Sequence, residues 1–448
     1  MANDLDAYIP EIWAQESLMI LEEQMVAANL VHRAFSNDVA RFGDTVNTRR
    51  PTNFEMKRKT DADDVTDQDA EATNVAVKLN QHNHVSFVIQ DGEESKGFLT
   101  LREEYLVPAM IAIARGLDQV ILGQAYQFLG NIAGSLGTAA TKAALTSTRT
   151  LLNNNKAPLV GRNLIISPDT EADLLNVGDF VNANTRGDDG SALREANLGR
   201  LLGFDTFMCQ NTPSVSDGSS TEGAQVNNVG GYPIGATTIT IDTTSEDLTA
   251  GSWCTIVGDM IPQKITAATG SPTTEITISP GLKRAVADDA VVTVYTPGAI
   301  DNTGGYAEGY AKNLTIDTFT VAPQSGQLIS IGAAASKPNY SAIGTPTTTS
   351  MMLDRPMEST ETDSTVIGVG PAGQYNLAFH QNAIALVSRP LAPPAPGTGA
   401  LSYVASNNGV GVRVTITYDG KAQGHRVTVD MLSGIKVLDT NLGAVMLA

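Results

Sequence analysis

The longest helical pattern in the chain is the stretch Thr100–Leu129, TLREEYLVPAMIAIARGLDQVILGQAYQFL. Its apolar residues recur at helical spacing, which places them on one broad face: Met110, Ile113, Ala114, Leu117, Val120, Ile121, Ala125 and Phe128. Thr100 and Glu103 have the spacing of a capping box. Because Pro108 lies inside the pattern, we expect a kink or a short first turn there. A helix of about 45 Å needs other elements packed across it.

Composition narrows the class of protein. The chain has 448 residues, a formal net charge of −19 and two cysteines, Cys209 and Cys254. This charge argues against a general nucleic-acid-binding surface, which needs a basic face. Two distant cysteines argue against a disulfide scaffold and fit a reducing compartment. No apolar run is long enough for a membrane span, so we expect none. The N-terminal residues do not show a basic region followed by an apolar core, so we expect no signal peptide.

The N-terminal stretch Tyr8–Phe35 predicts an amphipathic helix with Pro10 at its first position. Two interpretations are open. The helix packs on the chain's own core, or it is an arm that packs on a neighbouring subunit. The candidate arm contacts are Trp13, Leu18, Leu21 and Met25.

A long hairpin is predicted next. Gly43–Lys59 is extended, Asp61–Glu71 is a dense acidic run, and Asn74–Gln90 alternates apolar and polar residues as a strand does. Such a hairpin has too little core to be stable alone, so we expect it to lie on a partner. Its basic strand and acidic tip could pair between head-to-tail copies, and a solvated loop is the alternative. The candidate contacts are Arg49, Arg50, Lys57, Arg58, Lys59, Asp61, Asp63, Asp64 and Asp67.

Beyond the long helix, short helices and strands alternate, which indicates an α+β domain. We expect a helix over Thr138–Leu152, a strand over Arg162–Ser167 followed at once by a helix, and a turn and strand over Asn197–Pro213. Asn376–Arg389 is a short helix or strand. The C-terminal region predicts strands that cross the long helix: Val410–Tyr418, Val427–Met431, Gly434–Leu438 and Ala444–Leu447.

Between about residues 214 and 373 the chain is rich in Thr, Gly, Ser and Val, and it repeats itself. Gly251–Gly298 aligns with Gly326–Gly373 at a nearly constant offset, so that Ile256 meets Ile331 and Val291 meets Val366. We therefore predict two small β modules of one kind, at about 231–298 and 314–373, as two barrels or as two halves of one β domain. Their role is expected to be architectural.

Motifs with chemistry are weak. Gly368-Val-Gly370-Pro-Ala-Gly373 matches the dinucleotide fingerprint, but Pro371 lies within it and no acid follows at the required distance, so we interpret it as a module end. The acidic run lacks the glycine and glutamate of a calcium loop. His82 and His84 have no third metal ligand nearby. We expect no catalytic residue, no cofactor and no metal.

Several segments, taken in order, resemble the major capsid proteins of tailed phages, which share the Hong Kong ninety-seven fold. Within that family the chain is most similar to the coat proteins of the short-tailed Salmonella phage type, which carry a β insertion domain. Two modules depart from the single insertion expected there. The segments are YIPEIWAQESLMILEEQMVAANLVHRAF, GDTVNTRRP, FVIQDGEESKGF, LVPAMIAIARGLDQVILG, NLGRLLGFDTFMCQNTP, LDRP with GVGPAGQYNLAFHQNAIALVSRPLAPP, and VRVTITYDGKAQGHRVTVDMLSGIKVLDTNLGAVML.

The resemblance implies an α+β fold with a long spine helix, an extended hairpin loop, an N-terminal arm and an inserted all-β region of two repeated modules. The implied parts are an arm (1–42), an extended loop (43–98), the spine helix of a peripheral domain (99–135), an axial domain (136–213 and 374–398), the inserted region (214–373) and C-terminal strands of the peripheral domain (399–448).

The resemblance also implies a function. The chain would form pentamers and hexamers of an icosahedral shell around double-stranded DNA, in the virion, after assembly in the host bacterial cytoplasm. Its partners would be other copies, a scaffolding protein and a portal, with a decoration protein left open. Its proximity to DNA would be non-specific, with no membrane. The alternatives are an encapsulin-like compartment shell and a β-rich surface adhesin. For an enzyme we find no supporting set of residues.

Overall fold

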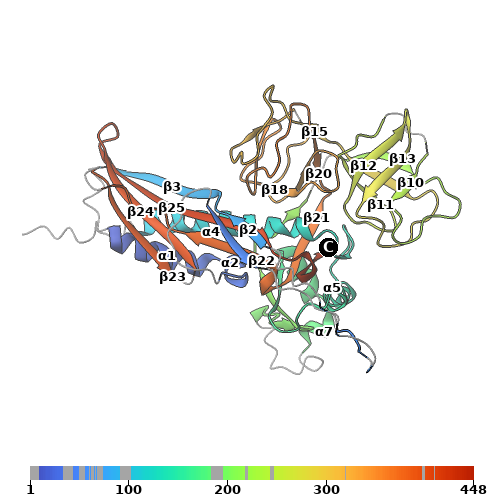
Figure 1. Ribbon diagram of the computed structural model, residues 1–448, viewed down its shortest axis with the longest axis horizontal. Helices are drawn as coiled ribbons and strands as arrows, with labels where there is room; N and C mark the ends of the chain where they lie inside the picture. Colours follow the sequence, from blue (N-terminus) through green and yellow to red (C-terminus); the bar gives the residue numbers. More distant parts are fainter. Residues whose placement is uncertain are drawn as a thin grey trace, which may run out of the picture. The chain divides into compact units, whose positions relative to one another are not determined.

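The computed structural model describes residues 10–33, 44–49, 56–59, 61, 65, 67, 74–90, 102–182, 195–216, 220–242, 247–317, 319–395, 399–407 and 409–448 (Figure 1). The chain divides into two compact units, each built from segments that are distant in the sequence. Unit 1 comprises Met1–Leu18, Arg33–Tyr105 and Ile384–Leu438. Unit 2 comprises Met19–His32, Leu106–Ala383 and Asp439–Ala448.

The long helix is present and changes type along its length. A π-helical turn at Arg102–Leu106 leads into α4 (Val107–Gly123), and a 3₁₀ segment, η3 (Gln124–Phe128), ends it. Pro108 lies in the first turn of α4, directly after the π-helical turn, and the chain stays helical through Leu106. The expected irregularity at Pro108 is therefore present as a change of helix type, without a break between a first turn and the main helix. All eight residues of the predicted apolar face are at most 4% exposed. Thr100 of the predicted capping box lies outside the described residues.

By length and apolar composition alone, Glu103–Phe128 could cross a membrane. However, 61% of its most apolar window is buried inside the protein, as in the core helix of a globular domain. We therefore interpret the segment as a core helix.

The N-terminal helix is described from Pro10 and is not continuous as the pattern suggested. Helix α1 (Pro10–Gln24) ends, and a separate turn of helix, α2 (Ala27–Leu30), follows it. The prediction of one helix over Tyr8–Phe35 is wrong at this break.

Unit 1 contains a five-stranded antiparallel sheet. Its order is β22 (Ile384–Arg389), β25 (Gly424–Val437), β24 (Val410–Asp419) and β23 (Leu401–Asn407), with β3 (Gln81–Gln90) also paired to β25. Every second residue of a strand points to the same face of the sheet, and in β24 the alternating residues Val410, Val412 and Val414 are fully buried.

The base of the predicted hairpin is confirmed, and most of its tip lies outside the described residues. Strand β1 (Thr45–Arg49) pairs with β2 (Asn74–Lys78) in antiparallel register from Thr45↔Lys78 to Arg49↔Asn74. The single second strand expected over Asn74–Gln90 is wrong, because the chain leaves β2 after Lys78 and starts β3 at Gln81. Strand β3 pairs with β25 along its whole length, from Gly424↔Gln90 to Ser433↔Gln81.

Two glycines of β25 allow the segment Lys78–Gln90 to lie directly against this strand. A side chain at Gly424 would collide with the carbonyl of Ile89, and one at Gly434 would collide with that of Lys78. Glycine at these positions lets the N-terminal strands approach the C-terminal sheet closely.

Unit 2 contains a seven-stranded mixed sheet. Its order is β4 (Ile132–Gly134), β26 (Gly443–Leu447), β21 (Gly373–His380), β5 (Arg162–Ile166), β7 (Phe204–Met208) and β6 (Arg200–Leu201), with β8 (Ser214–Val215) also paired to β21. Strands β5 and β26 are buried along their whole length. The ambiguous stretch Asn376–Arg389 is strand, interrupted by one 3₁₀ turn, η4 (Gln381–Ala383).

Strand β26 is the last of the predicted C-terminal strands, and it does not join the others. It pairs with β21 and β4 in unit 2, whereas β23, β24 and β25 lie in unit 1. The expectation of one C-terminal set of strands is wrong for this segment. A short apolar run has no feature that selects one sheet over another.

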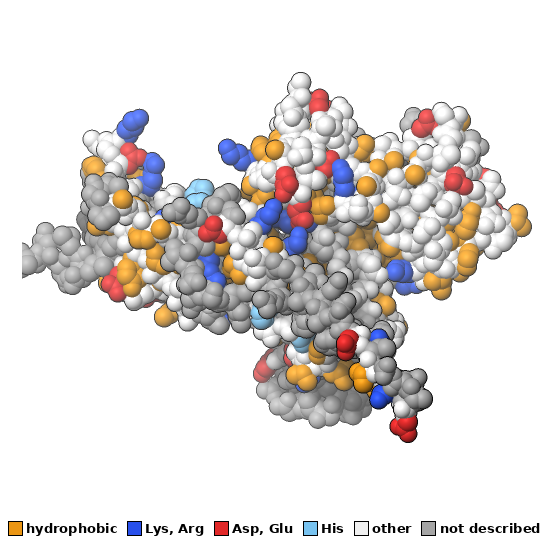
Figure 2. All heavy atoms as spheres, in the orientation of Figure 1, with side chains coloured by type: hydrophobic (Ala, Val, Ile, Leu, Met, Phe, Trp, Pro, Cys, Tyr) orange, Lys and Arg blue, Asp and Glu red, His pale blue; other side chains and the backbone are white. Residues whose placement is uncertain are grey.

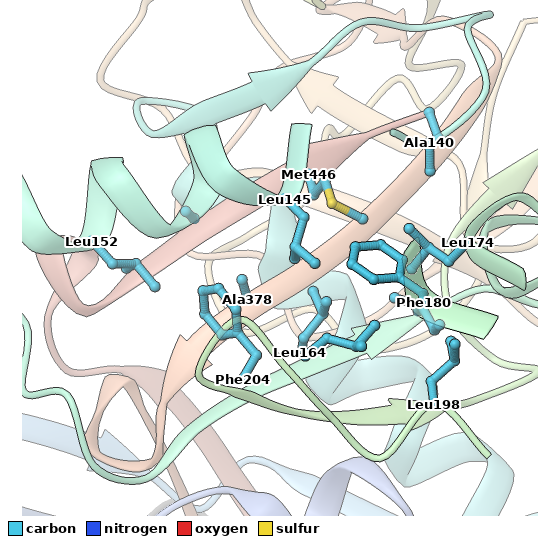
Figure 3. Packing of buried hydrophobic residues seen from close by; sticks show 14 of the residues in the cluster. Ala140, Leu145, Leu152, Leu164, Leu174, Phe180, Leu198, Phe204, Ala378 and Met446 are labelled. Atoms are coloured by element: carbon cyan, nitrogen blue, oxygen red, sulfur yellow. The ribbon is translucent and has the colours of Figure 1, made fainter. Parts of the chain in front are cut away.

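Helices cover this sheet, and their starts follow the sequence. Helix α5 (Lys142–Asn154) is capped by Thr141, and α6 (Pro168–Leu175) by Ser167, whose hydroxyl accepts from the amide of Thr170 at 3.2 Å. A short helix, α7 (Gly178–Val181), follows. Figure 3 shows side chains of these helices meeting those of the sheet, with Leu145, Leu164 and Phe204 among the fully buried ones.

The repeated region forms two modules with one topology. Module 1 has β9 (Ser220–Gln225), β10 (Thr238–Thr240), β11 (Trp253–Ile256), β12 (Gln263–Gly270), β13 (Thr273–Ser279) and β14 (Val291–Tyr295). Module 2 has β15 (Gly298–Ala299), β16 (Leu314–Thr315), β17 (Leu328–Ile331), β18 (Asn339–Ile343), β19 (Ser350–Leu353) and β20 (Val366–Val369). The sheet orders, β10-β13-β12-β11-β14-β9 and β16-β19-β18-β17-β20-β15, match strand for strand. Each module has its own core, around Ile265 and Tyr340 respectively.

The repeat begins earlier than the sequence alignment suggested. The first strands start at Ser220 and Gly298, so the predicted starts at about 231 and 314 are too late. The added part contains a shared loop. We call Asn228–Gly235 loop 1 and Asn302–Gly309 loop 2. Gly231 and Gly305 both have φ of +63°, a region that favours glycine.

Candidate functional site

Because we expect no catalytic residue, cofactor or metal, the candidate site is the set of surfaces that could contact other copies of the chain. The first is the extended loop. At its base, Val77 and Leu79 are fully buried and pack with Ala385, Val387 and Leu432 of unit 1. The base of the ribbon is thus anchored by apolar burial.

Beyond the base, the loop offers uncovered apolar side chains. Met56 is 86% exposed and Val65 is 76% exposed. Two strands alone are marginally stable in water, so such a segment gains most from a surface laid against it.

The charged candidates lie as follows. Lys57, Arg58 and Lys59 are exposed and belong to no helix or strand, and Asp61 and Asp67 are exposed as well. Arg49 is the last residue of β1, opposite Asn74. Arg50, Asp63 and Asp64 lie outside the described residues.

The arm candidates are buried in the chain itself. Trp13 and Leu21 are 0% exposed, Met25 is 3% and Leu18 is 8%. The Trp13 ring lies 6.3 Å from that of Phe87 in unit 1. These positions fit the interpretation of a helix packed on its own core, and a role in contacting a neighbour stays a prediction.

Sequence reasoning missed Asp118, which holds the second N-terminal helix. Its carboxylate accepts from the amide of Val26 at 2.9 Å and from that of Ala28 at 3.2 Å, so it caps α2 from the middle of α4. Burial raises the pKa of Asp118 to about 6, against the lowering by these amides. The available signal in the sequence was a single acid among the apolar residues of the helix pattern. In the structure this acid is 1% exposed.

Module 2 is anchored at the end of the long helix. Two side-chain amides form the contact. Gln127 Nε2 donates a hydrogen bond to the backbone carbonyl of Asn339 at 2.6 Å, and Asn339 Nδ2 donates to the backbone carbonyl of Tyr126 at 3.1 Å. Gln124 Nε2 donates to Asp354 Oδ2 at 3.0 Å. Burial raises the pKa of Asp354, and the Arg355 guanidinium opposes that shift.

Module 1 is anchored to the residues just after the same helix end. Lys283 Nζ donates to the carbonyl of Gly130 at 2.9 Å, and Arg284 Nη2 to that of Gly134 at 2.8 Å. Cations suit the carbonyl-rich end of a helix.

A cavity of about 410 Å³ lies where the helix end and both modules meet, lined among others by Tyr126, Trp253, Lys264 and Lys337. Lys264 is 3% exposed, and its Nζ donates to the carbonyl of Ala334 in module 2 at 3.1 Å. Burial lowers the pKa of Lys264 to about 8, with a further contribution from Lys337.

The glycine fingerprint serves packing. Strand β20 ends at Val369 and strand β21 starts at Gly373, so no helix follows the motif as a dinucleotide site requires. A side chain at Gly368 would collide with the carbonyl of Gly251, and one at Gly370 with Leu328. The interpretation as a module end is confirmed.

The two histidines of the predicted strand lie close together and beside an acid. His82 and His84 have ring centroids 6.0 Å apart, and His82 Nε2 lies 3.4 Å from Asp430. Within the part of the chain that the structure describes, no group of three or more His, Cys, Asp or Glu side chains could hold a metal ion.

Comparisons with known proteins return phage structures. No protein family and no curated protein matches the chain. Similar solved structures include Mycobacterium phage Che8 (15% identity, 94% of this chain and 90% of that chain, TM-score 0.42) and the capsid of cyanophage P-SCSP1u (12%, 93% and 89%, 0.41). The mature capsid of bacteriophage PhiM1 is a third (10%, 93% and 88%, 0.40). Identities and TM-scores of this size do not establish a common fold.

Proposed function

We propose that the chain is the major capsid protein of a tailed phage. In this proposal it assembles into pentamers and hexamers of an icosahedral shell around double-stranded DNA and has no catalytic role. The proposal is supported by the seven sequence segments that resemble tailed-phage capsid proteins in order along the chain. It extends to the virion location, the scaffolding and portal partners, and the division into arm, extended loop, peripheral domain, axial domain and insertion.

One structural observation carries the assembly part of the proposal. Met56 and Val65 are exposed in the stretch that connects the two paired strands β1 and β2. Lateral contact with another copy would cover these side chains. Obligate interfaces typically bury about 2,000 Å² or more, and an extended loop adds contact area without enlarging the core.

Charge provides an orientation for that contact. The basic segment Lys57–Lys59 and the acidic run Asp61–Glu71 lie on one loop, so head-to-tail copies would bring opposite charges together. Head-to-tail contacts generate closed rings when the rotation between copies closes.

The test is the assembly state of the purified chain, with and without a scaffolding protein, by mass photometry and electron microscopy. We expect capsomers or closed shells. Lys57→Glu and Arg58→Glu, each made alone, are expected to reduce assembly, whereas Lys312→Glu on module 2 changes the net charge by the same amount and should not. A monomer under every condition contradicts the proposal. Shells isolated from their source with enzyme cargo in place of DNA favour an encapsulin-like compartment.

A further inference from the structure

The cavity where the helix end and both modules meet holds a buried cation that has no acid as its partner. Lys264 of β12 is 3% exposed, and its Nζ donates to the backbone carbonyl of Ala334 in module 2 at 3.1 Å. Within the described part of the chain, Lys264 forms no ion pair. An ammonium group that is buried beside a neutral carbonyl loses most of the stabilisation that water would give it.

The acids around this cavity are held by other cations. Lys337 Nζ donates to both carboxylate oxygens of Glu361, at 2.7 and 2.6 Å. Glu358, which lines the cavity, accepts from Arg355 Nε at 2.7 Å. Figure 2 shows basic and acidic side chains gathered on the surface near β18, at the base of module 2. Neither Glu358 nor Glu361 comes within ion-pair distance of Lys264.

A second ammonium group lines the same cavity. Lys337 repels Lys264, and this repulsion adds to burial in lowering the pKa of Lys264 to about 8, while Glu361 opposes the shift only in part. An anion placed in the cavity would be attracted by both lysines and would supply the charge that Lys264 lacks.

The fold does not require a lysine at this position, as the second module shows. Trp253 and Leu328 are the first residues of the equivalent strands β11 and β17. Lys264 pairs with Trp253, and Ser341 pairs with Leu328. Ser341 is 1% exposed, so module 2 builds the same strand pair with a buried neutral residue.

We propose that this cavity, which we call the anion site, binds a phosphate group. Its lining includes Lys264, Lys337 and the hydroxyl-bearing residues Ser279 and Ser336. Lysine ammonium groups bind phosphate as point charges, and hydroxyls can donate further hydrogen bonds to its oxygens. A volume of about 410 Å³ admits inorganic phosphate or a small phosphorylated molecule, whereas a DNA duplex is too broad to enter.

A bound phosphate would join parts of the protein that are distant in the sequence. Lys264 belongs to module 1 and Lys337 to module 2, and the backbone of the long helix ends beside them at Gln127 and Leu129. Occupancy of the anion site would therefore hold the two modules against each other. This inference goes beyond the proposed shell and does not depend on it, because every residue of the anion site lies in one chain.

The first test is thermal denaturation of the full chain after dialysis into phosphate-free buffer. Inorganic phosphate is expected to raise the midpoint of unfolding, since a ligand that binds only the folded state stabilises it by mass action. Sodium chloride at equal ionic strength should raise it less. Lys264→Met should lose the response to phosphate. Without phosphate this variant should be at least as stable as the unsubstituted chain, because it removes a buried charge.

Lys312→Met is the matched control for charge. Lys312 is exposed on module 2 and does not line the anion site, so this variant should respond to phosphate as the unsubstituted chain does. If Lys264 serves only as a hydrogen-bond donor to Ala334, Lys264→Met will be less stable without phosphate and will still respond to it. That result overturns the proposal. So does an absent response of the unsubstituted chain, or an equal response to sodium chloride or to acetate.

A second variant supplies the missing charge from the protein. Ser336 is exposed, so Ser336→Asp should fold, and its carboxylate should compete with phosphate for the two lysines. We expect a stabilised protein that no longer responds to phosphate. Thr303→Asp on loop 2 adds the same charge outside the lining and should keep the response. An undiminished response in Ser336→Asp overturns the proposal.

The pH dependence of binding is the third test. The titratable groups at the anion site are Lys264, Lys337, Glu358 and Glu361, with Tyr126 beside them. Calorimetric titration with phosphate should show affinity falling as the pH rises through about 8, by up to about ten-fold per pH unit, because Lys264 loses its proton. Lys264→Arg keeps its charge and should bind without this fall. A flat profile for the unsubstituted chain contradicts the role of Lys264.

The source of the phosphate group is decided by a second probe. Titration with adenosine monophosphate is compared with inorganic phosphate on the same protein. Tighter binding of the nucleotide assigns the anion site to a phosphorylated small molecule, and tighter binding of inorganic phosphate assigns it to the free anion. Binding of either probe that survives Lys264→Met unchanged overturns the proposal.

Discussion

The indole N–H of Trp253 in module 1 donates a hydrogen bond to the hydroxyl of Ser330 in module 2 over 2.9 Å. Trp253 is 1% exposed and Ser330 is 0% exposed. A buried polar contact of this kind fixes orientation, because any other arrangement of the modules would leave both groups without a partner.

This contact predicts coupled stability effects. Trp253→Phe removes the donor and should destabilise the protein by about 1–2 kcal/mol, and Ser330→Ala leaves the indole N–H unpaired at a cost of about 1–3 kcal/mol. Because both changes break the same bond, the double variant should lose less than the sum. Urea denaturation of the four proteins measures this. Strictly additive losses would contradict the assignment.

The shared loops predict parallel effects in the two modules. Gly231→Ala and Gly305→Ala should each cost more than about 1–3 kcal/mol, since a side chain there adds a collision with a carbonyl to the strain of positive φ. Gly235→Ala and Gly309→Ala are the controls: φ is again positive, but nothing lies within 4 Å of the added atom. Thermal denaturation should rank each pair in the same order.

Asp118 predicts a pH-dependent term in stability. Its pKa in the folded protein, about 6, lies above the ordinary value of 3.8. The contribution of this group is therefore fully present below about pH 4 and is lost as the pH rises through about 6. Asp118→Asn should lose roughly 1–3 kcal/mol less stability than the unsubstituted protein between pH 4 and 7.

Urea titrations across that pH range check the prediction for Asp118. Other carboxyl groups titrate in both proteins and cancel in the difference. Asp242→Asn, at an exposed position, is the control and should follow the unsubstituted curve. Parallel curves for Asp118→Asn would show that this carboxyl does not set the dependence.

The ends of the inserted region predict that it is removable. Strand β8 pairs with β21 through Val215↔Gly373 and Ser214↔Gln374. Replacing residues 216–372 with Asn-Gly should close a tight hairpin on an existing antiparallel pair. We expect a soluble protein with a cooperative thermal transition, less stable because Tyr126 and Gln124 lose their partners in module 2. Aggregation with no such transition, even with Tyr126→Ser, would contradict this.

Local signals in the sequence were sufficient for several elements. The spacing of Met110, Ile113 and Leu117 predicted the long helix, and Ser167-Pro168 predicted the start of α6, because caps and periodicity act within one turn. The module repeat was visible in the sequence because the two copies keep similar residues at matching positions, although its first part was missed. The available signal was Asn-x-Gly-Gly-Tyr, which occurs in both loop 1 and loop 2.

Long-range choices could not be predicted. Strand β3 pairs with β25, which lies near the other end of the chain, and the glycines that admit it lie on the partner. Asp118 caps a helix that is also far from it in the sequence, since Ala28 lies 90 residues earlier. In both cases the deciding group belongs to another segment, so the pattern of one segment cannot reveal it.

The pairing of β8 with β21 also bears on how such a chain changes over time. Entry and exit of the inserted region are neighbours on one ladder, and module 2 starts at Gly298, directly after module 1 ends at Tyr295. A single in-frame recombination can thus add, remove or double a module without altering the register of the host sheet. One copy is then free to keep its ancestral surface while the other acquires a new one.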